Sequence, residues 1–572
     1  MQTLHTAKPV IAVDLTAKRK QEREEDYVPQ SVNGRDCHFN TAGEASPWAT
    51  ATVSEARIDT FTMPIRVVGG EIARAVDETE EALVALHVPV LVRGGAGFLC
   101  HPIVDKRPAA DHSETEVTLL TRMNPHSMGY VLNKHKITFQ RWDERAKRWR
   151  NIDPPRAVVE KLLAKSTWPR LPHVVGVVTV PTLRPDGTVL SQPGYDPATK
   201  LWCAPAGDLR LPPICATREA AEAALVLFKE LLSEFPFVTG LDRAVALAAL
   251  MTPVLRGACD VTPLLLILAT TPGSGKSYLA DIASTIDRAQ KCPVITAARG
   301  EEAEKRLGAL ILEGVQIISL DNCIYDLGGA MLCQIVERPL IRTRILGKSE
   351  TPECEWRGTL FANGNNIGVM GDMTRRTIEC NLEPGVERPE LREFSFDPIE
   401  RVMANRGAYV AAALTMALAY RKSEERVACD PIASYGQWSR VVREPLIWLG
   451  EDDPVRSMER ARDMDAEQAA ARELVAHWSA CLGLDEQYTA REIVQQVCHD
   501  GTVLLKCPEF RDLLLHQCGV GGQVDIKKLG QWLKRISGRL YDGHKIVPGR
   551  ADKHDKVQRW MLTAVQDAGI AG

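Results

Sequence analysis

The stretch LLLILATTPGSGKSYLADIA, from Leu264 to Ala283, decides the fold of this chain. Five apolar residues, Leu264 to Leu268, predict a buried parallel strand, and the glycine-rich loop after them leads directly into a helical pattern. A strand, a glycine-rich loop and a helix in this order are the setting of a phosphate-binding P-loop. Glycines in such a loop turn backbone N–H groups toward phosphates, and the positive end of the helix dipole adds to the attraction.

The loop also carries the side chains that ATP and Mg²⁺ need. Lys276 can reach the β- and γ-phosphates, and the Ser277 hydroxyl can bind Mg²⁺. The usual pattern has glycine where this chain has Thr270. An ordinary glycine-rich turn is the alternative interpretation, and the order strand, loop, helix favours the P-loop. The expected nucleotide-binding residues are Pro272, Gly273, Ser274, Gly275, Lys276, Ser277 and Tyr278.

Composition sets the broad class of the protein. The 572 residues, 45% hydrophobic and 25% charged, are enough for about three or four globular domains. A formal net charge of −4 means that any nucleic-acid binding must come from local basic patches. No run of about 18 apolar residues and no signal-peptide pattern occurs, so we expect no membrane span and a cytoplasmic location. The fifteen cysteines include no C-x-x-C pair. We therefore expect no disulfide and no structural zinc.

A second acidic motif comes after the P-loop. Val315 to Asn322 reads VQIISLDN, an apolar strand ending in Asp321, which would orient Mg²⁺. This acid lies 45 residues after Lys276 (321 − 276), in a series of alternating strands and helices. Asn322 stands where many ATPases have the glutamate that polarises water; an amide can orient water but cannot remove its proton. Glu301 and Glu302 are further candidates for that task.

Three more elements come after Asp321. Leu340 to Glu350 interleaves apolar residues with Arg342, Arg344 and Lys348, and predicts a hairpin arm. Gly358 to Ala362 predicts a third core strand, which ends in ANGNN with Asn365 as a candidate sensor of the γ-phosphate. Arg375 and Arg376 come ten residues later (375 − 365). An arginine supplied by a neighbouring subunit can stabilise the charge of a transferring phosphoryl group.

The series TTPGSGKS, IISLDN, a Lys-tipped hairpin, ANGNN and GDMTRR resembles the AAA+-type core of superfamily 3 and related helicases of phages, plasmids and integrative elements. The upstream VPTLRPDGTVLSQPGYDPAT is similar to the segment preceding this core in prophage primase–helicase-like proteins. The likeness runs from about Pro172 to Trp560. It implies a hexameric ring with ATP between subunits. It also implies that Lys276, Ser277 and Asp321 act in one subunit, with Asn365 as sensor of the γ-phosphate. By the same resemblance, Arg375 or Arg376 reaches this site from the next subunit. Arg342, Arg344 and Lys348 would then bind DNA phosphates in the central pore.

The N-terminal part reads as an α+β module. Gly70 to Leu86 predicts an amphipathic helix, and Pro155 to Leu163 predicts a short one. The strands His173 to Val180 and Thr188 to Ser191 flank the turn signal PDG and predict a hairpin. A basic run with two tryptophans can bind a nucleic-acid backbone and stack bases, and an exposed amphipathic edge explains it equally well. This run contains Arg141, Trp142, Arg145, Lys147, Arg148, Trp149 and Arg150.

The C-terminal part predicts a winged helix. Thr489 to Glu492 reads as a capping box, and Glu509 to Leu515 and Ile526 to Ile536 read as helices. Arg539 to Val547 and Val557 to Leu562 predict a two-stranded wing. From Asp525 to Trp560 ten basic residues face four acidic ones, a local footprint for DNA. A role in protein contacts is the alternative, and Trp532 is assigned to the core. The expected DNA-binding residues of this part are Lys527, Lys528, Lys534 and Arg535.

Together these patterns predict an α/β fold: a P-loop AAA+-type ATPase core with an N-terminal α+β module and a C-terminal winged-helix domain. The predicted domains are a flexible tail over 1–60, the α+β module over 61–235, the ATPase core over 236–395, a helical lid and linker over 396–475, and the winged-helix domain over 476–572.

The expected function is an ATP- and Mg²⁺-dependent DNA helicase or translocase for replication of a mobile genetic element. The expected partners are single-stranded or forked DNA, five further copies of the chain in a hexamer, and a primase or polymerase. A replication initiator or helicase loader that hydrolyses ATP without processive unwinding is the first alternative. A P-loop kinase for a small molecule is the second, against which the arginine pair and the basic C-terminal part argue. A non-catalytic DNA-binding scaffold, raised by Asn322, is the third.

Overall fold

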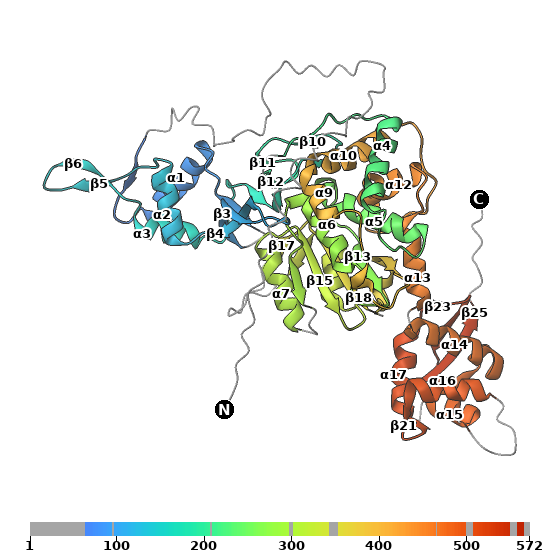
Figure 1. The fold of residues 1–572 in the computed structure, drawn as a ribbon. Helices are drawn as coiled ribbons and strands as arrows, with labels where there is room; N and C mark the ends of the chain where they lie inside the picture. The colour runs from blue at the N-terminus through green and yellow to red at the C-terminus, as the bar shows by residue number, and fades with distance from the viewer. Residues whose placement is uncertain are drawn as a thin grey trace, which may run out of the picture. The chain divides into compact units, whose positions relative to one another are not determined.

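A five-stranded parallel sheet forms the centre of the fold (Figure 1). The computed structural model describes residues 63–93, 97–205, 209–296, 301–342, 353–365, 367–464, 466–498, 507–549 and 557–564, so the tail predicted over 1–60 lies outside the described residues. The strand order is β14-β15-β18-β13-β19, and every neighbouring pair is parallel. These strands are β13 (Leu264–Ala269), β14 (Val294–Thr296), β15 (Ile317–Cys323), β18 (Thr359–Asn365) and β19 (Thr377–Leu382).

The strand–loop–helix unit predicted around Lys276 is confirmed. β13 has a strand neighbour on each edge and is buried on both faces, which explains why all six of its residues are apolar. It leads through the glycine-rich loop into α6 (Lys276–Arg288). β14 and α7 (Glu301–Leu312) come next, as expected for a series of alternating strands and helices, and the predicted strand ending in an acid corresponds to β15. α8 (Ala330–Glu337) comes after β15.

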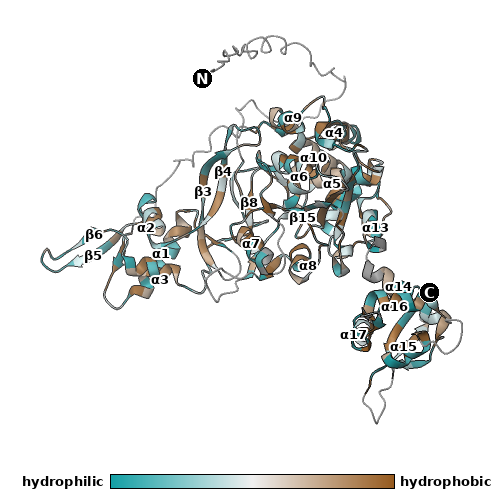
Figure 2. Cartoon of the chain, turned by 60° about the horizontal axis from the view of Figure 1, so that its bottom comes forward, coloured by the Kyte–Doolittle hydropathy of each residue, from teal (hydrophilic) through white to brown (hydrophobic). Residues whose placement is uncertain are grey.

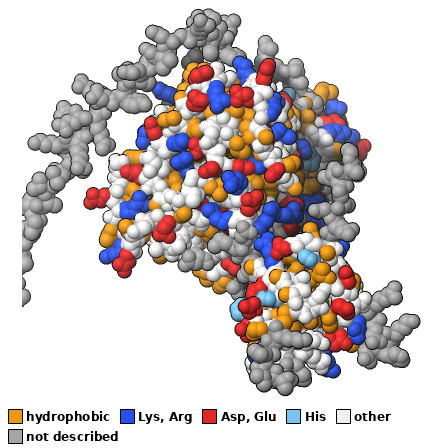
Figure 3. All heavy atoms as spheres, turned by 90° about the vertical axis from the view of Figure 1, so that its right-hand side faces the viewer, with side chains coloured by type: hydrophobic (Ala, Val, Ile, Leu, Met, Phe, Trp, Pro, Cys, Tyr) orange, Lys and Arg blue, Asp and Glu red, His pale blue; other side chains and the backbone are white. Residues whose placement is uncertain are grey.

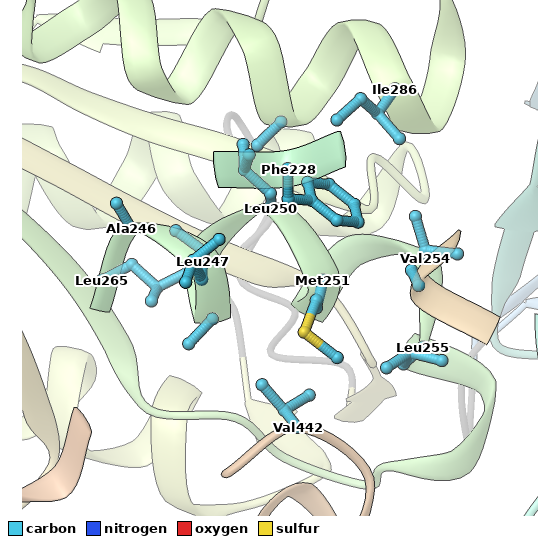
Figure 4. Packing of buried hydrophobic residues seen from close by; sticks show 14 of the residues in the cluster. Phe228, Ala246, Leu247, Leu250, Met251, Val254, Leu255, Leu265, Ile286 and Val442 are labelled. Carbon is cyan, nitrogen blue, oxygen red and sulfur yellow. The ribbon is translucent and has the colours of Figure 1, made fainter. Parts of the chain in front are cut away.

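A largely apolar helix packs at the centre of the main hydrophobic core. α5 (Gly240–Val254) carries buried residues on all sides, which is typical of a helix enclosed by other elements. It packs against α6 and α10 (Arg406–Lys422), and α4 (Arg218–Leu231) contributes buried residues to the same core. Figure 4 shows Leu250, Met251 and Val254 of α5 beside Phe228 of α4 and Val442.

The lid and linker segment predicted over 396–475 begins with two helices that pack into this core. α9 (Pro398–Ala404) and α10 meet at an angle of 88°. Within the described ranges no single helix is long and apolar enough to span a membrane, and only this bent pair passes the same criteria jointly. Further helices after α10 are α11 (Gly436–Trp438), α12 (Glu444–Trp448) and α13 (Ser457–Met464).

The N-terminal α+β module has its own hydrophobic core. The predicted amphipathic helix is α1, and it packs against α3. Two sheets belong to this part, one in the order β1-β5-β6 and the other in the order β4-β3-β2-β7, in which β7 is His173–Val174. Its elements are β1 (Ile65–Val67), α1 (Ile72–Ala85), β2 (Leu91–Arg93), β3 (Phe98–Pro108), β4 (Glu114–Arg122), α2 (Pro125–Lys134), β5 (Phe139–Asp143), β6 (Arg148–Ile152) and α3 (Arg156–Leu163).

The hairpin around the PDG turn forms with a different first strand than predicted. β9 (Thr182–Leu183) pairs with β10 (Val189–Leu190), so the turn itself is confirmed. The stretch His173 to Val180 is instead divided into β7 (His173–Val174), which pairs with β2, and β8 (Gly176–Val178), which pairs with β12 (Leu201–Cys203). β12 also pairs with β11 (Gly194–Asp196). Pairing with strands distant in sequence outweighs the local hairpin signal here.

A buried arginine connects the N-terminal module with the central sheet region. Arg93, at the end of β2, is 1% exposed. Its guanidinium donates hydrogen bonds to the carbonyl oxygens of Val174 (3.3 Å), Ile311 (2.7 Å) and Glu355 (2.9 Å). A buried charge needs such partners, because an unpaired one is strongly disfavoured in an apolar interior.

The C-terminal part has a separate hydrophobic core that includes Trp478, Phe510, Trp532 and Leu533. The predicted helices are confirmed, as is the capping box between Thr489 and Glu492. Of the two strands predicted for the wing, the second forms, but Arg539 to Val547 divides into two strands that pair with each other. Its four-stranded sheet has the order β20-β25-β24-β23. The elements are α14 (Ala466–Cys481), β20 (Gln487–Thr489), α15 (Ala490–Cys498), α16 (Pro508–Cys518), β21 (Gly519–Val520), β22 (Gln523–Val524), α17 (Ile526–Ile536), β23 (Leu540–Tyr541), β24 (His544–Pro548) and β25 (Arg559–Ala564).

The expectation that the chain has no disulfide is wrong. Cys481, at the end of α14, is bonded to Cys507, just before α16. The separation of 26 residues gave no sign that these two helix ends meet. Most other described cysteines are buried thiols, and burial raises the pKa of Cys259, for example, to about 12.

One buried acid makes stability depend on pH. Glu379 of β19 is 2% exposed, and burial raises the pKa of its carboxyl to about 7, against the opposing charge of Arg460. Between about pH 4.5 and pH 7 the Glu379 carboxyl has lost its proton in the unfolded chain but keeps it in the folded chain. The free energy of unfolding therefore falls as the pH rises through this range.

We expect Glu379→Gln to raise the melting temperature at pH values above about 7 and to change it little near pH 5, since the folded wild-type side chain is then already neutral. The full effect corresponds to roughly 3 kcal/mol. Thermal unfolding at both pH values measures it, with the exposed Glu424→Gln as control. An equal difference from wild type at both pH values would contradict the prediction.

Candidate nucleotide site

The loop between β13 and α6 favours glycine at two positions. Gly273 and Gly275 have φ angles of 73° and 91°, which L side chains rarely adopt. A Cβ atom at Gly275 would lie 3.4 Å from the Phe235 ring, and one at Gly273 would lie 3.3 Å from the backbone nitrogen of Glu390. The turn is therefore tight, and α6 begins directly after it at Lys276 with its N-terminal amides facing the loop.

Thr270, the departure from the usual loop pattern, does not disturb this geometry. It is not among the non-glycine residues with positive φ, so its backbone needs no glycine. Its hydroxyl donates a hydrogen bond to Glu383 Oε2 (2.7 Å), just beyond the end of β19. The threonine thus ties the start of the loop to the neighbouring strand.

Lys276 lies half-buried at the base of the loop. Its Nζ donates a hydrogen bond to the carbonyl oxygen of Thr271 (3.1 Å). Burial lowers the pKa of Lys276, and the negative charge of Asp321 opposes the shift. Ser277 is exposed at the second position of α6. The structure therefore brings the amine, the hydroxyl and the carboxylate of the sequence prediction to one end of the sheet.

A bulge in β15 determines where Asp321 lies. Opposite β18, Leu320 pairs with Ala362 and Cys323 with Gly364, so Asp321 and Asn322 together face the single residue Asn363. Asn322 has a φ of 51°, in the left-handed region that asparagine tolerates better than most residues. A glutamate at this position would carry backbone strain, which is a physical reason for the amide found there.

Asn363 replaces the backbone pairing that the bulge interrupts. Its Oδ1 accepts a hydrogen bond from the Asn322 backbone N–H (3.0 Å), and its Nδ2 donates one to Asp321 Oδ1 (2.7 Å). It is 3% exposed. Sequence reasoning included Asn363 only as part of ANGNN and chose Asn365, because the register that joins Asn363 to the acid is visible only in the folded sheet.

Asn365 lies beside the loop. It pairs with Ala269, the last residue of β13, and its Oδ1 is buried without a hydrogen-bond partner in the described part of the chain. β13 and β18 are neighbours in the sheet. The chain after β13 crosses to β14 at one edge of the sheet, whereas the chain after β18 crosses to β19 at the other edge. Open parallel sheets bind ligands at such a point, beyond the carboxyl ends of the strands.

The two arginines differ in their freedom. Arg376 is 3% exposed and forms ion pairs with Glu337 (2.6 Å) and Asp372 (2.5 Å) of its own chain. Arg375 is 42% exposed and pairs with Asp372 at 2.7 Å. An open cavity of about 750 Å³ lies beside them, lined by residues of the α8 region and of Met370 to Arg376, and its lining includes no residue of the glycine-rich loop.

Tyr278 points away from the loop toward α9. Its hydroxyl donates a hydrogen bond to Asp397, the N-cap of α9, and burial raises the pKa of Tyr278. Phe235, which the sequence did not single out, lies against Gly275 and stacks on Phe237 with 5.8 Å between ring centroids. An aromatic ring beside the loop is a feature that no local motif in the sequence indicated.

The remaining predicted residues lie in other parts of the structure. β16 (Leu340–Arg342) and β17 (Glu353–Glu355) form an antiparallel pair, in which Arg342 forms an ion pair with Glu353 (2.8 Å). Arg344, Lys348 and the side chain of Glu301 lie outside the described residues. Glu302 is exposed and pairs with Arg306 (3.1 Å). Lys527, Lys528, Lys534 and Arg535 are exposed on α17. Among described residues, no group of three or more His, Cys, Asp or Glu side chains could hold a metal ion.

No family model matches the chain, and no curated protein matches it. Among solved structures, the apo form of the NrS-1 C-terminal region is similar with a TM-score of 0.33 and 13% identity, over 78% of this chain and 100% of that one. SCCmec type IV Cch, described as an active helicase, has a TM-score of 0.31 and 12% identity, over 83% of this chain and 97% of that one. JCV helicase has a TM-score of 0.19 and 12% identity, over 46% and 74%. Because all these TM-scores lie below 0.5, a function for this chain must be inferred from the geometry of the site and not from these likenesses.

We expect Asn363→Leu to weaken Mg²⁺-dependent nucleotide binding by about 10-fold or more, because residues that orient a metal-binding carboxylate have effects of this size. Binding in EDTA should change little, since Lys276 and the loop are intact. A fluorescent ATP analogue titrated with and without Mg²⁺ measures both affinities. Thr359→Val, on the same strand and also buried, is the matched control. Unchanged binding in Mg²⁺ would contradict the role given to Asn363.

Proposed function

We propose that this chain is an ATP- and Mg²⁺-dependent DNA helicase or translocase that acts as a hexameric ring in the replication of a mobile genetic element. One observation carries the proposal: the P-loop with Lys276, the carboxylate of Asp321 and the amide of Asn365 meet at the carboxyl ends of β13, β15 and β18. These are the positions at which a parallel α/β sheet binds a nucleotide. The motif resemblance extends the proposal to DNA and to the ring.

The donor set fits Mg²⁺, a cation that prefers oxygen ligands. Asp321 keeps one carboxylate oxygen on Asn363 and has a second that this hydrogen bond does not use. Ser277 presents its hydroxyl from the first turn of α6. A bound Mg²⁺ would neutralise charge on the phosphate oxygens, while the loop amides and Lys276 hold the phosphates in place. Asn322 can orient a water molecule at this edge, and it cannot take up a proton.

Arg375 is the better candidate to complete the site of a neighbouring subunit. The Arg376 guanidinium is 3% exposed and is enclosed by Glu337 and Asp372, so its withdrawal would break two ion pairs at a buried position. Arg375 shares the same acids at the surface and can exchange them for phosphate at little cost, because exposed ion pairs are weak. Arg376 then holds the short helix Gly371–Arg375 in position.

Local basic elements supply contacts for DNA on a chain of net negative charge. Figure 3 shows acidic and basic side chains interspersed on one face rather than gathered in a continuous field. α17 buries Leu529, Trp532, Leu533 and Ile536 and leaves its basic residues on the opposite side. Such a stripe fits a helix that lies along the DNA backbone, as in a winged helix.

The proposal predicts that single-stranded DNA stimulates ATP hydrolysis, and that Lys276→Ala and Arg375→Ala each lower the stimulated rate by about 10³-fold or more. Neither variant should hydrolyse ATP alone, but a mixture should regain activity. In a mixed ring some interfaces join an intact loop to an intact arginine. Arg401→Ala, a partly exposed and ion-paired arginine of α9, is the control.

Hydrolysis that is indifferent to DNA, or a mixture that stays inactive, would contradict the proposal. Strand displacement from a forked duplex, assayed with the same preparations, separates a helicase from an initiator or loader. A loader would hydrolyse ATP on DNA without releasing the strand.

We further expect Lys534→Glu to weaken duplex DNA binding and to reduce the slope of log K against log salt by about 0.9, the value for one phosphate contact. Fluorescence anisotropy over a series of salt concentrations measures this slope. Arg491→Glu, an exposed basic residue on α15, is the control and should leave the slope unchanged. Equal effects of the two variants would remove α17 from the DNA interface.

A further inference from the structure

The hairpin of β5 and β6 combines a firm root with a polar, projecting end. β6 is the outer strand of the sheet β1-β5-β6. At the root Phe139 is fully buried and pairs with Ile152, so the hairpin is anchored in the core of the N-terminal module. Beyond this pair the strands extend past helices α1, α2 and α3 (Figure 1) and are largely hydrophilic (Figure 2).

One face of the hairpin carries an aromatic platform. Trp142 and Trp149 stand directly opposite each other on the two strands, with ring centroids 5.7 Å apart in an edge-to-face arrangement. The Arg66 guanidinium, from β1, lies over the Trp149 ring at 4.9 Å. Trp142 is 40% exposed. Trp149 is thus fixed by its neighbours, and Trp142 presents ring surface to the solvent.

The other face and the tip carry positive charge in excess. Arg141 pairs with Arg150 and Asp143 with Arg148 across the strands, so these four side chains share one face. Between residues 139 and 152 five basic residues stand against two acidic ones, an excess of three. Asp143 binds Arg150 (2.9 Å) and Glu144 binds Lys147 (2.9 Å). Within the described ranges, Arg141, Arg145 and Arg148 form no ion pair.

We propose that the hairpin Phe139–Ile152 is a binding site for single-stranded nucleic acid, in which Trp142 stacks on a base while Arg141, Arg145 and Arg148 contact phosphates. Single strands are bound in this way by aromatic side chains set among basic ones, because every base offers a flat face for stacking. Uncompensated arginines on a chain with a net charge of −4 give charge complementarity to a polyanion. Paired bases in a duplex offer no such face to Trp142, so the site selects unpaired strands.

A different explanation is that the same residues protect the exposed edge of the sheet from pairing with another strand. Charged side chains on an outer strand prevent edge-to-edge association, and that role needs neither Trp142 nor unpaired charge on the inner strand β5. The two explanations differ in what they predict for Trp142 and for Arg141. The site is also separate from the P-loop and does not rest on the proposed function.

The test is nucleotide-free fluorescence anisotropy of the full chain with labelled oligo-dT, with oligo-rU and with duplex DNA as further arms. Arg141→Glu combined with Arg148→Glu should weaken oligo-dT binding by about 10-fold and lower the salt slope by about 1.4, for two single-strand phosphate contacts. Trp142→Ala should weaken it by about 5-fold or more, and Trp142→Phe should retain affinity, because a smaller ring still stacks. Arg156→Glu with Lys161→Glu, exposed on α3 of the same module, is the control of equal charge.

The proposal stands if the hairpin variants lose more affinity for single strands than the α3 control does, and if their loss for duplex is smaller. The oligo-rU arm then shows whether the site distinguishes RNA from DNA. Equal losses in the hairpin and α3 variants, or unchanged binding by Trp142→Ala, would overturn it. The changed residues are surface side chains, so unchanged thermal unfolding verifies the fold. Because no ATP is present, an inactive P-loop would leave this result intact, and the two proposals can fail separately.

Discussion

β13 exchanges backbone hydrogen bonds with β18 along one edge and with β19 along the other, and both of its faces are buried. A strand enclosed on four sides cannot shift its register without breaking two ladders and exposing apolar side chains. The point at which it ends is therefore fixed to within one residue. The loop that begins there must turn back within a few residues, which requires the left-handed backbone at Gly273 and Gly275. The position of Lys276 is a consequence of this enclosure.

The sequence predicted those parts of the site whose signals are local. β13, the glycine-rich loop, α6 and the acid at the end of β15 are each encoded by neighbouring residues. The role of Asn363 is not, because it depends on a bulge in one strand and on the register of the next. The pairing of Cys481 with Cys507, the contact of Phe235 with Gly275 and the division of His173 to Val180 into two strands are also tertiary. Resemblance could name Arg375 and Arg376 together, but only burial separates their roles.

The arginines of this chain differ in whether an acidic side chain compensates their charge. Arg342 and Arg376 have acidic partners within hydrogen-bond distance, so their charge adds little to the field around the molecule. Arg141 and Arg148 on the projecting hairpin have no such partner among the described residues, and their field reaches the solvent. A net charge near zero therefore conceals both arrangements. The informative quantity for a polyanionic partner is the number of uncompensated charges on one element, not the total for the chain.

Arg93 sets a practical limit on how the protein can be divided. Its guanidinium binds carbonyl oxygens that belong to β7, α7 and β17, and the last of these lies 262 residues away in the sequence. A truncated chain that starts after the N-terminal module would lose this donor to the carbonyl oxygens of Ile311 and Glu355, which is a destabilising change. Such a fragment would contain Lys276, Ser277, Asp321 and Asn363 and would still fold less stably. Loss of activity in a fragment of that kind would thus report on folding, and only substitutions in the intact chain can assign chemistry to single residues.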